Sequence, residues 1–347
     1  MTARPRFKWL RVGVGFALLV GCCGLATTAW AGGGGAWSRS KMPDKPVIDA
    51  LAVDPAHPQV VYAAGFEYGL YKSGNGGRTW NSPIPSASIH ALAIDPRRTE
   101  TVFVGTVGGL YKSTDGTRTW HAVSRDGIES LAIDPQRPDT VYAGGLRLHK
   151  TIDGGRTWRE VDKGVPPEDS TGLSMEVVAL ASDPAVPRIV YAATELGLFK
   201  TTTGGRNWTR LDIDSRHIHT LAIDPRNPKI VYVGAGTSSP RAHGIGVFKS
   251  TDGGRRWTPS NAGLQDLYVR ALVLDPKHPT TVYVGTDHGG VFRSTNGGHS
   301  WKPFNRGLEI VERETSGMRI DSLAVSADGR FLHAGTDVGV FNASVGG

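Results

Sequence analysis

The chain has 347 residues, of which 20% are charged, and it contains 46 glycines and nine tryptophans but only two cysteines. This composition excludes an intrinsically disordered chain and a small disulfide-stabilised domain. The formal net charge is +7, but Arg4, Arg6, Lys8 and Arg11 supply four of these charges at the N-terminus. Without them only a small positive charge is left, which gives no reason to expect nucleic-acid binding.

The first 31 residues have the layout of a secretory leader. Basic residues precede an apolar run over residues 12–25, and Ala29-Trp30-Ala31 fits a signal-peptide cleavage site. Residues 19–22 also resemble a bacterial lipobox, which predicts lipidation at Cys22. A third alternative is an uncleaved anchor, because residues 12–31 are long enough to span a bilayer. All three alternatives place the folded part outside the cytoplasm, as a periplasmic, secreted or lipid-anchored protein.

The predicted domain organisation has three parts. Residues 1–31 form the leader, residues 32–36 form a glycine-rich tether, and residues 37–347 form one folded domain. Both cysteines, Cys22 and Cys23, lie in the leader, so the folded domain has neither a disulfide nor a thiolate metal site. The stability of the domain must therefore come from packing.

A repeat fills the folded domain. One unit contains strand-length apolar runs at residues 89–96, 101–106 and 109–113, separated by Asp-Pro or Gly-rich turns, and it ends near Trp120. The Asp-Pro pairs recur at Asp54, Asp95, Asp134, Asp183, Asp224 and Asp275, and the tryptophans recur at Trp80, Trp120, Trp158, Trp208, Trp257 and Trp301. Four strands per unit at a period of about 40–50 residues predict a β-propeller blade.

A seventh unit begins at Ile320, but the chain ends before its fourth strand. A propeller must close its ring, so the missing strand is expected from the other end of the chain. Trp37 precedes Asp54 by a spacing similar to that between Trp80 and Asp95. The sequence therefore predicts an all-β fold, a seven-bladed β-propeller of four-stranded blades that is closed by an N-terminal strand at Trp37.

The turns before the tryptophans, such as residues 113–120 and 250–257, resemble the Asp-box of the BNR-repeat propellers. That family includes sialidases, xyloglucanases, sortilin-type receptors and photosystem II assembly factors. The Asp-Pro and Val-Tyr signatures are most similar to the sortilin and xyloglucanase style of repeat, whereas the sialidase and assembly-factor propellers are more distant. The resemblance implies the propeller fold but no particular activity.

The box residues are expected to have structural roles. Asp115, Asp153 and Asp252 would accept hydrogen bonds from turn amides, and each tryptophan would pack between neighbouring sheets. Asn75 and Thr203 stand at the equivalent position in other units, and this variation fits a turn better than a catalytic group.

The resemblance also implies that the boxes lie on the face opposite the binding surface. That surface would consist of the loops that join strand four to the next blade and strand two to strand three. The residues expected to begin the inner strands are mostly ionisable and predict a solvated polar ring that buries little apolar area: Asp49, His90, Glu129, Val178, His219, Arg270 and Asp321.

A denser polar cluster falls on blades five and six. With His90, the predicted binding residues are His219, Arg241, His243, Tyr268, Arg270, Asp287 and His288. His217 and His219 would lie on one side of a strand, as in some metal sites. No third ligand can be assigned, so solvated polar residues are the preferred interpretation and no metal or other cofactor is expected.

Hydrolase chemistry is the competing interpretation. Glycoside hydrolysis needs two opposed carboxyl groups, for which Glu129, Asp321 and Asp49 are the candidates. A sialidase would carry an Arg-Ile-Pro motif, which this sequence lacks. The xyloglucanases of the family use two aspartates across a cleft between two propellers, and this chain has the length of one.

Basic residues recur in the third strand of successive units, at Lys72, Lys112, Lys150, Lys200, Lys249 and Arg293. Their even spread around the ring predicts solvated charge and not a nucleic-acid groove. The function predicted from the sequence is that of an exported, monomeric, non-catalytic scaffold. It would bind an envelope or extracellular protein, or a glycan, on the face opposite the boxes, with possible membrane attachment through Cys22 or an uncleaved leader. The alternative is a glycan-active hydrolase.

Overall fold

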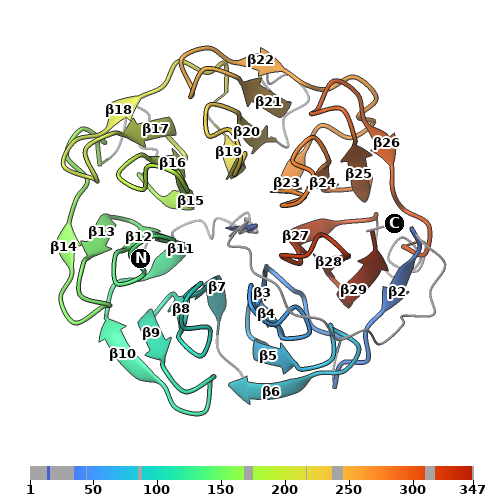
Figure 1. Cartoon of the computed structure of the whole chain (residues 1–347), viewed down its shortest axis with the longest axis horizontal. Helices are drawn as coiled ribbons and strands as arrows, with labels where there is room; N and C mark the ends of the chain where they lie inside the picture. Colours follow the sequence, from blue (N-terminus) through green and yellow to red (C-terminus); the bar gives the residue numbers. More distant parts are fainter. Residues whose placement is uncertain are drawn as a thin grey trace, which may run out of the picture.

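The computed structural model describes residues 14–15, 35–43, 45–84, 88–167, 175–215, 217–236, 245–308 and 317–345. Seven sheets are arranged radially around a central axis, and each sheet forms one blade (Figure 1). The predicted seven-bladed propeller is thus confirmed. Apart from Val14–Gly15, the leader with Cys22 lies outside the described residues, as do Arg241 and His243. Within the described ranges, no helix is long and apolar enough to cross a membrane.

The strands of each blade pair antiparallel in chain order, from the innermost strand outward. Blade one comprises β3 (Ala50–Val53), β4 (Val61–Gly65), β5 (Gly69–Ser73) and β6 (Asn81–Ile84), and β1 (Val14–Gly15) pairs in parallel with β3. Blade two comprises β7 (Ile89–Ile94), β8 (Val102–Thr106), β9 (Gly109–Ser113) and β10 (His121–Ser124). Blade three comprises β11 (Ile128–Ile133), β12 (Val141–Gly145), β13 (Leu148–Thr151) and β14 (Arg159–Glu160). Blade four comprises β15 (Val177–Ser182), β16 (Val190–Thr194), β17 (Gly197–Thr201) and β18 (Thr209–Arg210).

Blade five comprises β19 (Ile218–Ile223), β20 (Val231–Ala235), β21 (Gly246–Ser250) and β22 (Thr258–Pro259). Blade six comprises β23 (Val269–Leu274), β24 (Val282–Thr286), β25 (Val291–Ser294) and β26 (Lys302–Pro303). Blade seven comprises β27 (Ile320–Val325), β28 (Phe331–Thr336), β29 (Gly339–Ser344) and β2 (Trp37–Arg39), the strand from the N-terminal side.

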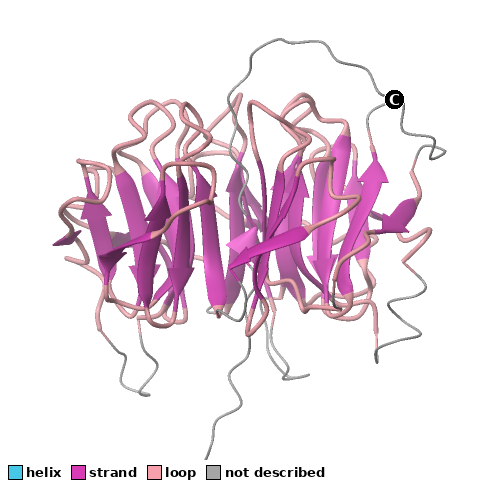
Figure 2. Cartoon of the chain, turned by 90° about the horizontal axis from the view of Figure 1, so that it is seen from below, coloured by secondary structure: helices cyan, strands magenta, loops and turns pink. Residues whose placement is uncertain are grey.

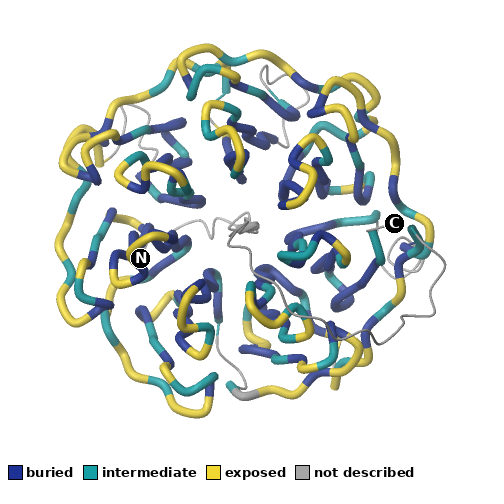
Figure 3. The backbone as a smooth tube through the Cα atoms, in the orientation of Figure 1, coloured by how far each residue is buried: buried dark blue, intermediate teal, exposed yellow. Residues whose placement is uncertain are grey.

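The core lies between the blades. Each blade is covered on both faces by its neighbours, so its first and second strands are apolar on both sides and almost completely buried (Figure 3). The second strands supply large buried rings such as Tyr142, Tyr191 and Tyr232. The short outermost strands are largely exposed. Burying this interface requires a neighbour on each side, which only a closed ring provides for every blade.

Alternation of strand direction gives the propeller two distinct faces (Figure 2). The box face carries the Asp-Pro turns between strands one and two and the box turns between strands three and four. The loop face carries the turns between strands two and three and the connections to the next blade. Inner strands begin on the loop face.

The ring closes between β2 and β29, as the sequence predicts. The two strands pair antiparallel, with Trp37 opposite Ala343 and Arg39 opposite Phe341. Trp37 is 5% exposed, its indole Nε1 donates to the Phe304 carbonyl at 2.7 Å, and its ring meets the Phe304 ring edge-on with centroids 5.9 Å apart. The N-terminal strand therefore completes blade seven and also anchors it to blade six.

The seam between blades seven and one has its own polar network. Asn342 Nδ2 donates to the Gly77 carbonyl at 2.9 Å and to Ser40 Oγ at 2.8 Å, while Asn342 Oδ1 lies 2.6 Å from His333 Nδ1. His333 is fully buried, and burial lowers its pKa to about 4. Gly77 has a φ of +80°, and a Cβ there would lie 2.6 Å from Asn342 Oδ1, so the close approach requires glycine.

A lysine in the third strand joins each of the first five blades to the next one. Its Nζ donates to the carbonyl of a glycine in the next box turn, at 2.7–2.9 Å, in the pairs Lys72–Gly116, Lys112–Gly154, Lys150–Gly204, Lys200–Gly253 and Lys249–Gly297. The ammonium also lies over an aromatic ring, 4.8 Å from the Tyr142 centroid for Lys150. Burial lowers the pKa of all five lysines. The expectation of solvated charge is therefore wrong for these lysines.

The closing tryptophans are not buried to the same degree. Trp80, Trp208 and Trp301 are at most 8% exposed, whereas Trp120, Trp158 and Trp257 are only partly buried against the core. All six follow a box turn, but Trp208 and Trp301 also donate through the indole Nε1 to carbonyls of the preceding blade, those of Val161 and Ser260.

Replacing Trp37 by Ala is expected to lower the free energy of unfolding by about 3–5 kcal/mol, the usual cost of truncating a buried aromatic side chain. Chemical denaturation measures this change. Ser38→Ala, at an exposed position in the same strand, should have little effect. Equal stability of Trp37→Ala and the parent would refute closure by this strand.

Lys112→Met should keep the apolar stem but remove the hydrogen bond to the Gly154 carbonyl. We expect a loss of about 1–2 kcal/mol in unfolding free energy, because a charged donor is lost and a carbonyl loses its partner. Arg118→Ala, at an exposed box position, is the matched control and should change stability by less than about 0.5 kcal/mol. If both variants are equally stable, the lysine contact contributes nothing to the ring.

Candidate functional site

The acidic residues of the box face are engaged by their own turns. Asp115 Oδ1 accepts hydrogen bonds from the amides of Arg118 and Thr119 at 3.0 and 2.9 Å, and the Thr119 hydroxyl donates to Asp115 Oδ2. These hydrogen bonds, the one from the Thr119 hydroxyl foremost, hold the pKa of Asp115 well below its usual range. Asp153 and Asp252 accept turn amides in the same way.

The Asp-Pro aspartates behave similarly. Asp95 Oδ1 accepts the amides of Arg97 and Arg98 at 2.9 and 3.0 Å, and its counterparts at Asp54, Asp134, Asp183, Asp224 and Asp275 make the equivalent bonds. All six are at most 7% exposed. The box and Asp-Pro aspartates therefore stabilise the turns of the box face.

The predicted ring of inner-strand residues lies on the loop face but is less solvated than expected. Asp49, His219, Arg270 and Asp321 are 4%, 7%, 6% and 0% exposed, because neighbouring blades cover the beginnings of these strands. The expectation that these positions bury little surface is wrong. Replacing them would leave buried charges without partners and endanger the fold.

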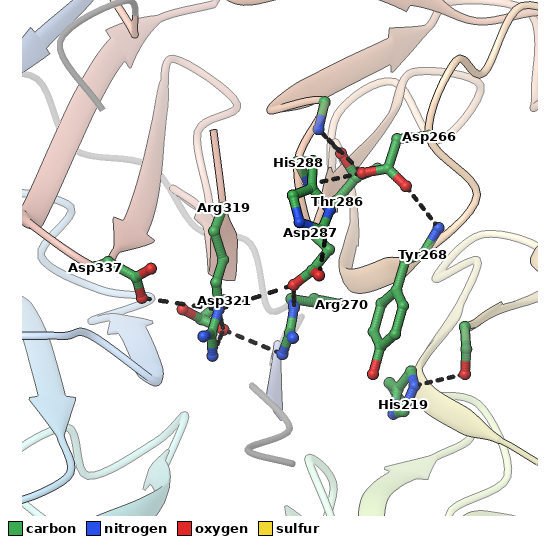
Figure 4. A network of polar contacts seen from close by, with 12 residues as sticks. His219, Asp266, Tyr268, Arg270, Thr286, Asp287, His288, Arg319, Asp321 and Asp337 are labelled. Atoms are coloured by element: carbon green, nitrogen blue, oxygen red, sulfur yellow. Dashed lines mark hydrogen bonds and ion pairs between the residues drawn. The ribbon is translucent and has the colours of Figure 1, made fainter. Parts of the chain in front are cut away.

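An ion-pair network on the loop face joins blades six and seven (Figure 4). The Arg270 guanidinium donates to Asp287 and lies 3.4 Å from Asp321 Oδ1. The Arg319 guanidinium lies 2.8 Å from the same Asp321 oxygen and 3.7 Å from Asp337. Burial raises the pKa of Asp321 to about 7, although both arginines oppose the shift. Two arginines thus compensate three aspartates.

His219 and Tyr268 form a stacked pair beside this network (Figure 4). Their ring centroids are 5.2 Å apart with planes inclined by 7°, and the Arg270 guanidinium lies 4.9 Å from the Tyr268 centroid. His219 Nε2 is 3.0 Å from the Gly236 carbonyl, which can only accept, so this nitrogen carries the proton. Burial lowers the pKa of His219 to about 4. The Tyr268 ring, a predicted binding residue, thus packs on the chain's own side chains.

Asp266 and the turn after β24 complete this side of the loop face. Asp266 accepts the amides of Tyr268, His288 and Gly289 at 2.9, 2.7 and 3.0 Å. His288 is exposed, and its Nδ1 lies 3.3 Å from Asp287 Oδ2. Thus Asp287, His288, Arg270, Tyr268 and His219 belong to one cluster, as the sequence predicts.

A second cluster occupies the loop face of blades two to four. His90 Nδ1 lies 3.1 Å from Glu129 Oε2, and the Phe66 ring meets the His90 ring edge-on at 5.8 Å. Glu176 is half-buried near Glu129 and Glu195. Burial and these two carboxylates raise the pKa of Glu176 to about 7, although His90 opposes the shift. This cluster therefore holds excess negative charge.

The three carboxyl groups that the sequence suggests for hydrolysis are engaged within the fold. Asp321 is fully buried and is held by two arginines, and Asp49 is buried on the adjacent blade. Glu129 is paired with His90. Within the described part of the chain, no three metal-ligating side chains lie together. His217 is exposed, whereas His219 is buried against Tyr268, so the two side chains lie in different environments.

Sequence reasoning missed Glu176, Glu195, Asp266, Arg319 and Asp337. Glu176 and Arg319 directly precede an inner strand, two positions before Val178 and Asp321 of the predicted polar ring. Glu195 and Asp337 are the first residues of turns between strands two and three, as Asp287 is. Alignment of those turns would have identified both acids, whereas nothing local marks Asp266.

Glu195→Gln should lower the pKa of Glu176, because one of the two repelling carboxylates is removed. An NMR titration of the side-chain carboxyl measures this pKa, and Glu160→Gln on the outer strand β14 is the control. The folded protein holds the Glu176 proton more tightly than the unfolded chain, so this group makes stability fall as pH rises from about 4.5 to about 7. An unperturbed Glu176 in the parent would contradict the cluster.

Comparison with solved structures identifies several propellers of the same fold. An ancestral GH74 enzyme matches with a TM-score of 0.71 and 21% identity, over 89% of this chain and 46% of that one. YCF48 bound to D1 peptide matches with a TM-score of 0.64 and 13% identity, over 90% and 97%. The extracellular domain of BT4673 from B. thetaiotaomicron matches with a TM-score of 0.66 and 13% identity, over 89% and 39%.

The chain thus spans about half the length of the GH74 enzyme and nearly the whole of YCF48. No protein-family model matches the sequence, and no curated protein matches it. At these identities the likeness establishes the seven-bladed fold, which is shared by GH74 enzymes, by YCF48 and by an extracellular domain.

Proposed function

We propose that the chain is an exported, non-catalytic scaffold that acts as a monomer and binds a protein or a glycan on its loop face. The observation that carries this proposal is the difference between the faces. The box and Asp-Pro aspartates on the box face accept hydrogen bonds from their own turns, whereas Glu176 on the loop face lies near Glu129 and Glu195, with His90 as the neighbouring counter-charge. A binding surface is where such uncompensated charge is expected.

The placement of the three candidate carboxyl groups, Glu129, Asp321 and Asp49, favours binding over catalysis. A glycosidase needs one carboxylic acid and one carboxylate that both reach the substrate. Asp321 and Asp49 are buried, and Asp321 is held by Arg270 and Arg319. Of the three candidate carboxylates, only Glu129 has a substantially exposed side chain, 24%.

The relatives in fold are compatible with this proposal. YCF48, whose length this chain matches, is a propeller seen with D1 peptide, and BT4673 provides an extracellular propeller. The basic and apolar leader supports export, with cleavage after Ala31 or lipid attachment at Cys22 as the alternatives. The GH74 match keeps a glycan-active hydrolase as the second candidate.

The purified chain should capture ligands from a panel of glycans and envelope proteins without turnover of glycan substrates. Glu129→Gln combined with His288→Ala should weaken capture about tenfold, because both side chains lie on the loop face and neither is deeply buried. Arg118→Ala on the box face is the matched control and should leave capture unchanged.

Two outcomes would overturn the proposal. Capture that is lost in Arg118→Ala but kept in the loop-face variant would place the site on the box face. Glycan turnover that is abolished by Glu129→Gln alone, with binding retained, would establish the hydrolase.

A further inference from the structure

The turn between strands two and three divides the loop face into two halves. The first residue of this turn is apolar in blades one to three, where it is Phe66, Val107 and Leu146. It is acidic in blades four, six and seven, where it is Glu195, Asp287 and Asp337. In blade five it is Gly236. The loop face therefore has an apolar half and an acidic half.

The apolar half is exposed. Val107 and Leu146 are 62% and 68% exposed, and Tyr68, in the same turn as Phe66, is 37% exposed. These three are among only five large hydrophobic residues that are exposed in the described part of the chain, and they lie at the same turn of three consecutive blades. Surface apolar residues are unremarkable singly, but a group of them around one rim marks an interaction surface.

The negative charge of the acidic half is compensated by arginines in blades six and seven but not in blade four. Asp287 and Asp337 lie against Arg270 and Arg319. Glu195 instead lies near Glu176, which in turn lies near Glu129, and His90 is the counter-charge paired with Glu129. Glu129 and Glu176 thus lie at the beginnings of the inner strands of blades three and four, and Leu146 is exposed in a turn of blade three.

Two cations of blade three are engaged by other acids. Arg147 follows Leu146, but its guanidinium binds Glu160 and Asp162 at 2.9 and 3.0 Å on the outer side of the blade. His149 likewise faces Asp126 at 3.6 Å.

We propose that the loop face binds an extended protein segment in which a lysine or arginine stands next to large apolar side chains. The apolar side chains would pack on Val107 and Leu146, and the cation would enter among Glu129, Glu176 and Glu195. The inference rests on the proposed binding function and specifies its partner. A neutral glycan would leave the carboxylates without a counter-charge, and the Tyr268 ring that could stack on a sugar already packs against His219 and Arg270.

Selection of a random dodecapeptide display library on the immobilised full chain tests this proposal. Enriched peptides should carry Lys or Arg beside Leu, Ile, Phe or Tyr. A synthetic enriched peptide should bind about tenfold more weakly to Glu176→Gln combined with Glu195→Gln, and about three- to tenfold more weakly to Leu146→Ser. Ile152→Ser is the control, because Ile152 is on the same blade and 67% exposed but lies on the box face. It should bind as the parent does. Circular dichroism confirms that each variant is folded.

The failures of the two proposals are distinguishable. Enriched peptides that lack a basic residue, but that still lose binding in the loop-face variant Glu129→Gln with His288→Ala, would overturn this inference and keep the proposed function. Peptides whose binding falls in Ile152→Ser and in no loop-face variant would overturn both. Absence of any enriched peptide would overturn the inference, while capture of a glycan would keep the broader proposal.

Discussion

Closure of the ring is the constraint on which the rest of the structure depends. Each blade is a sheet with two apolar faces, so it is stable only when a neighbour covers both. Six blades are completed within consecutive sequence, and the seventh borrows β2 from the N-terminal side. Trp37 is therefore more than one further repeat tryptophan, because it contacts blade six while its strand completes blade seven.

The seam between blades seven and one shows what closure demands chemically. At the junctions that follow blades one to five, a lysine on a tyrosine or phenylalanine ring reaches the next box turn. At the seam, Asn342 and the buried His333 take the corresponding places, and Ser40 adds a second donor to the Gly77 carbonyl. An uncharged pair suits this junction, because both side chains are at most 2% exposed and a buried ammonium would carry a large desolvation cost.

The same geometry separates stability from recognition. Box turns, Asp-Pro turns and the lysine contacts all lie on one face, where their polar groups are paired with the backbone. The loop face carries turns between strands two and three that vary from blade to blade, so the residues of these turns can change without loss of the lysine contacts. This separation explains how a regular ring can support an irregular surface with one apolar and one acidic half.

Local sequence patterns predicted the blades, the number of repeats and closure at Trp37, because strand alternation and turn chemistry are encoded within each repeat. They also placed Asp287, His288, Arg270 and Tyr268 together. They did not predict that Arg270 and His219 are buried, since burial depends on the adjacent blade. The lysine contacts were missed for the same reason, because each partner carbonyl lies about one repeat away in the sequence.

Hydrogen exchange of the complex with a bound peptide tests most directly whether the loop face is the binding face. The account predicts slower amide exchange in the turns that contain Val107, Leu146 and Glu195 and at the beginnings of the neighbouring inner strands, with no change in the box turns. Protection confined to the box turns around Asp115 and Asp153 would contradict it.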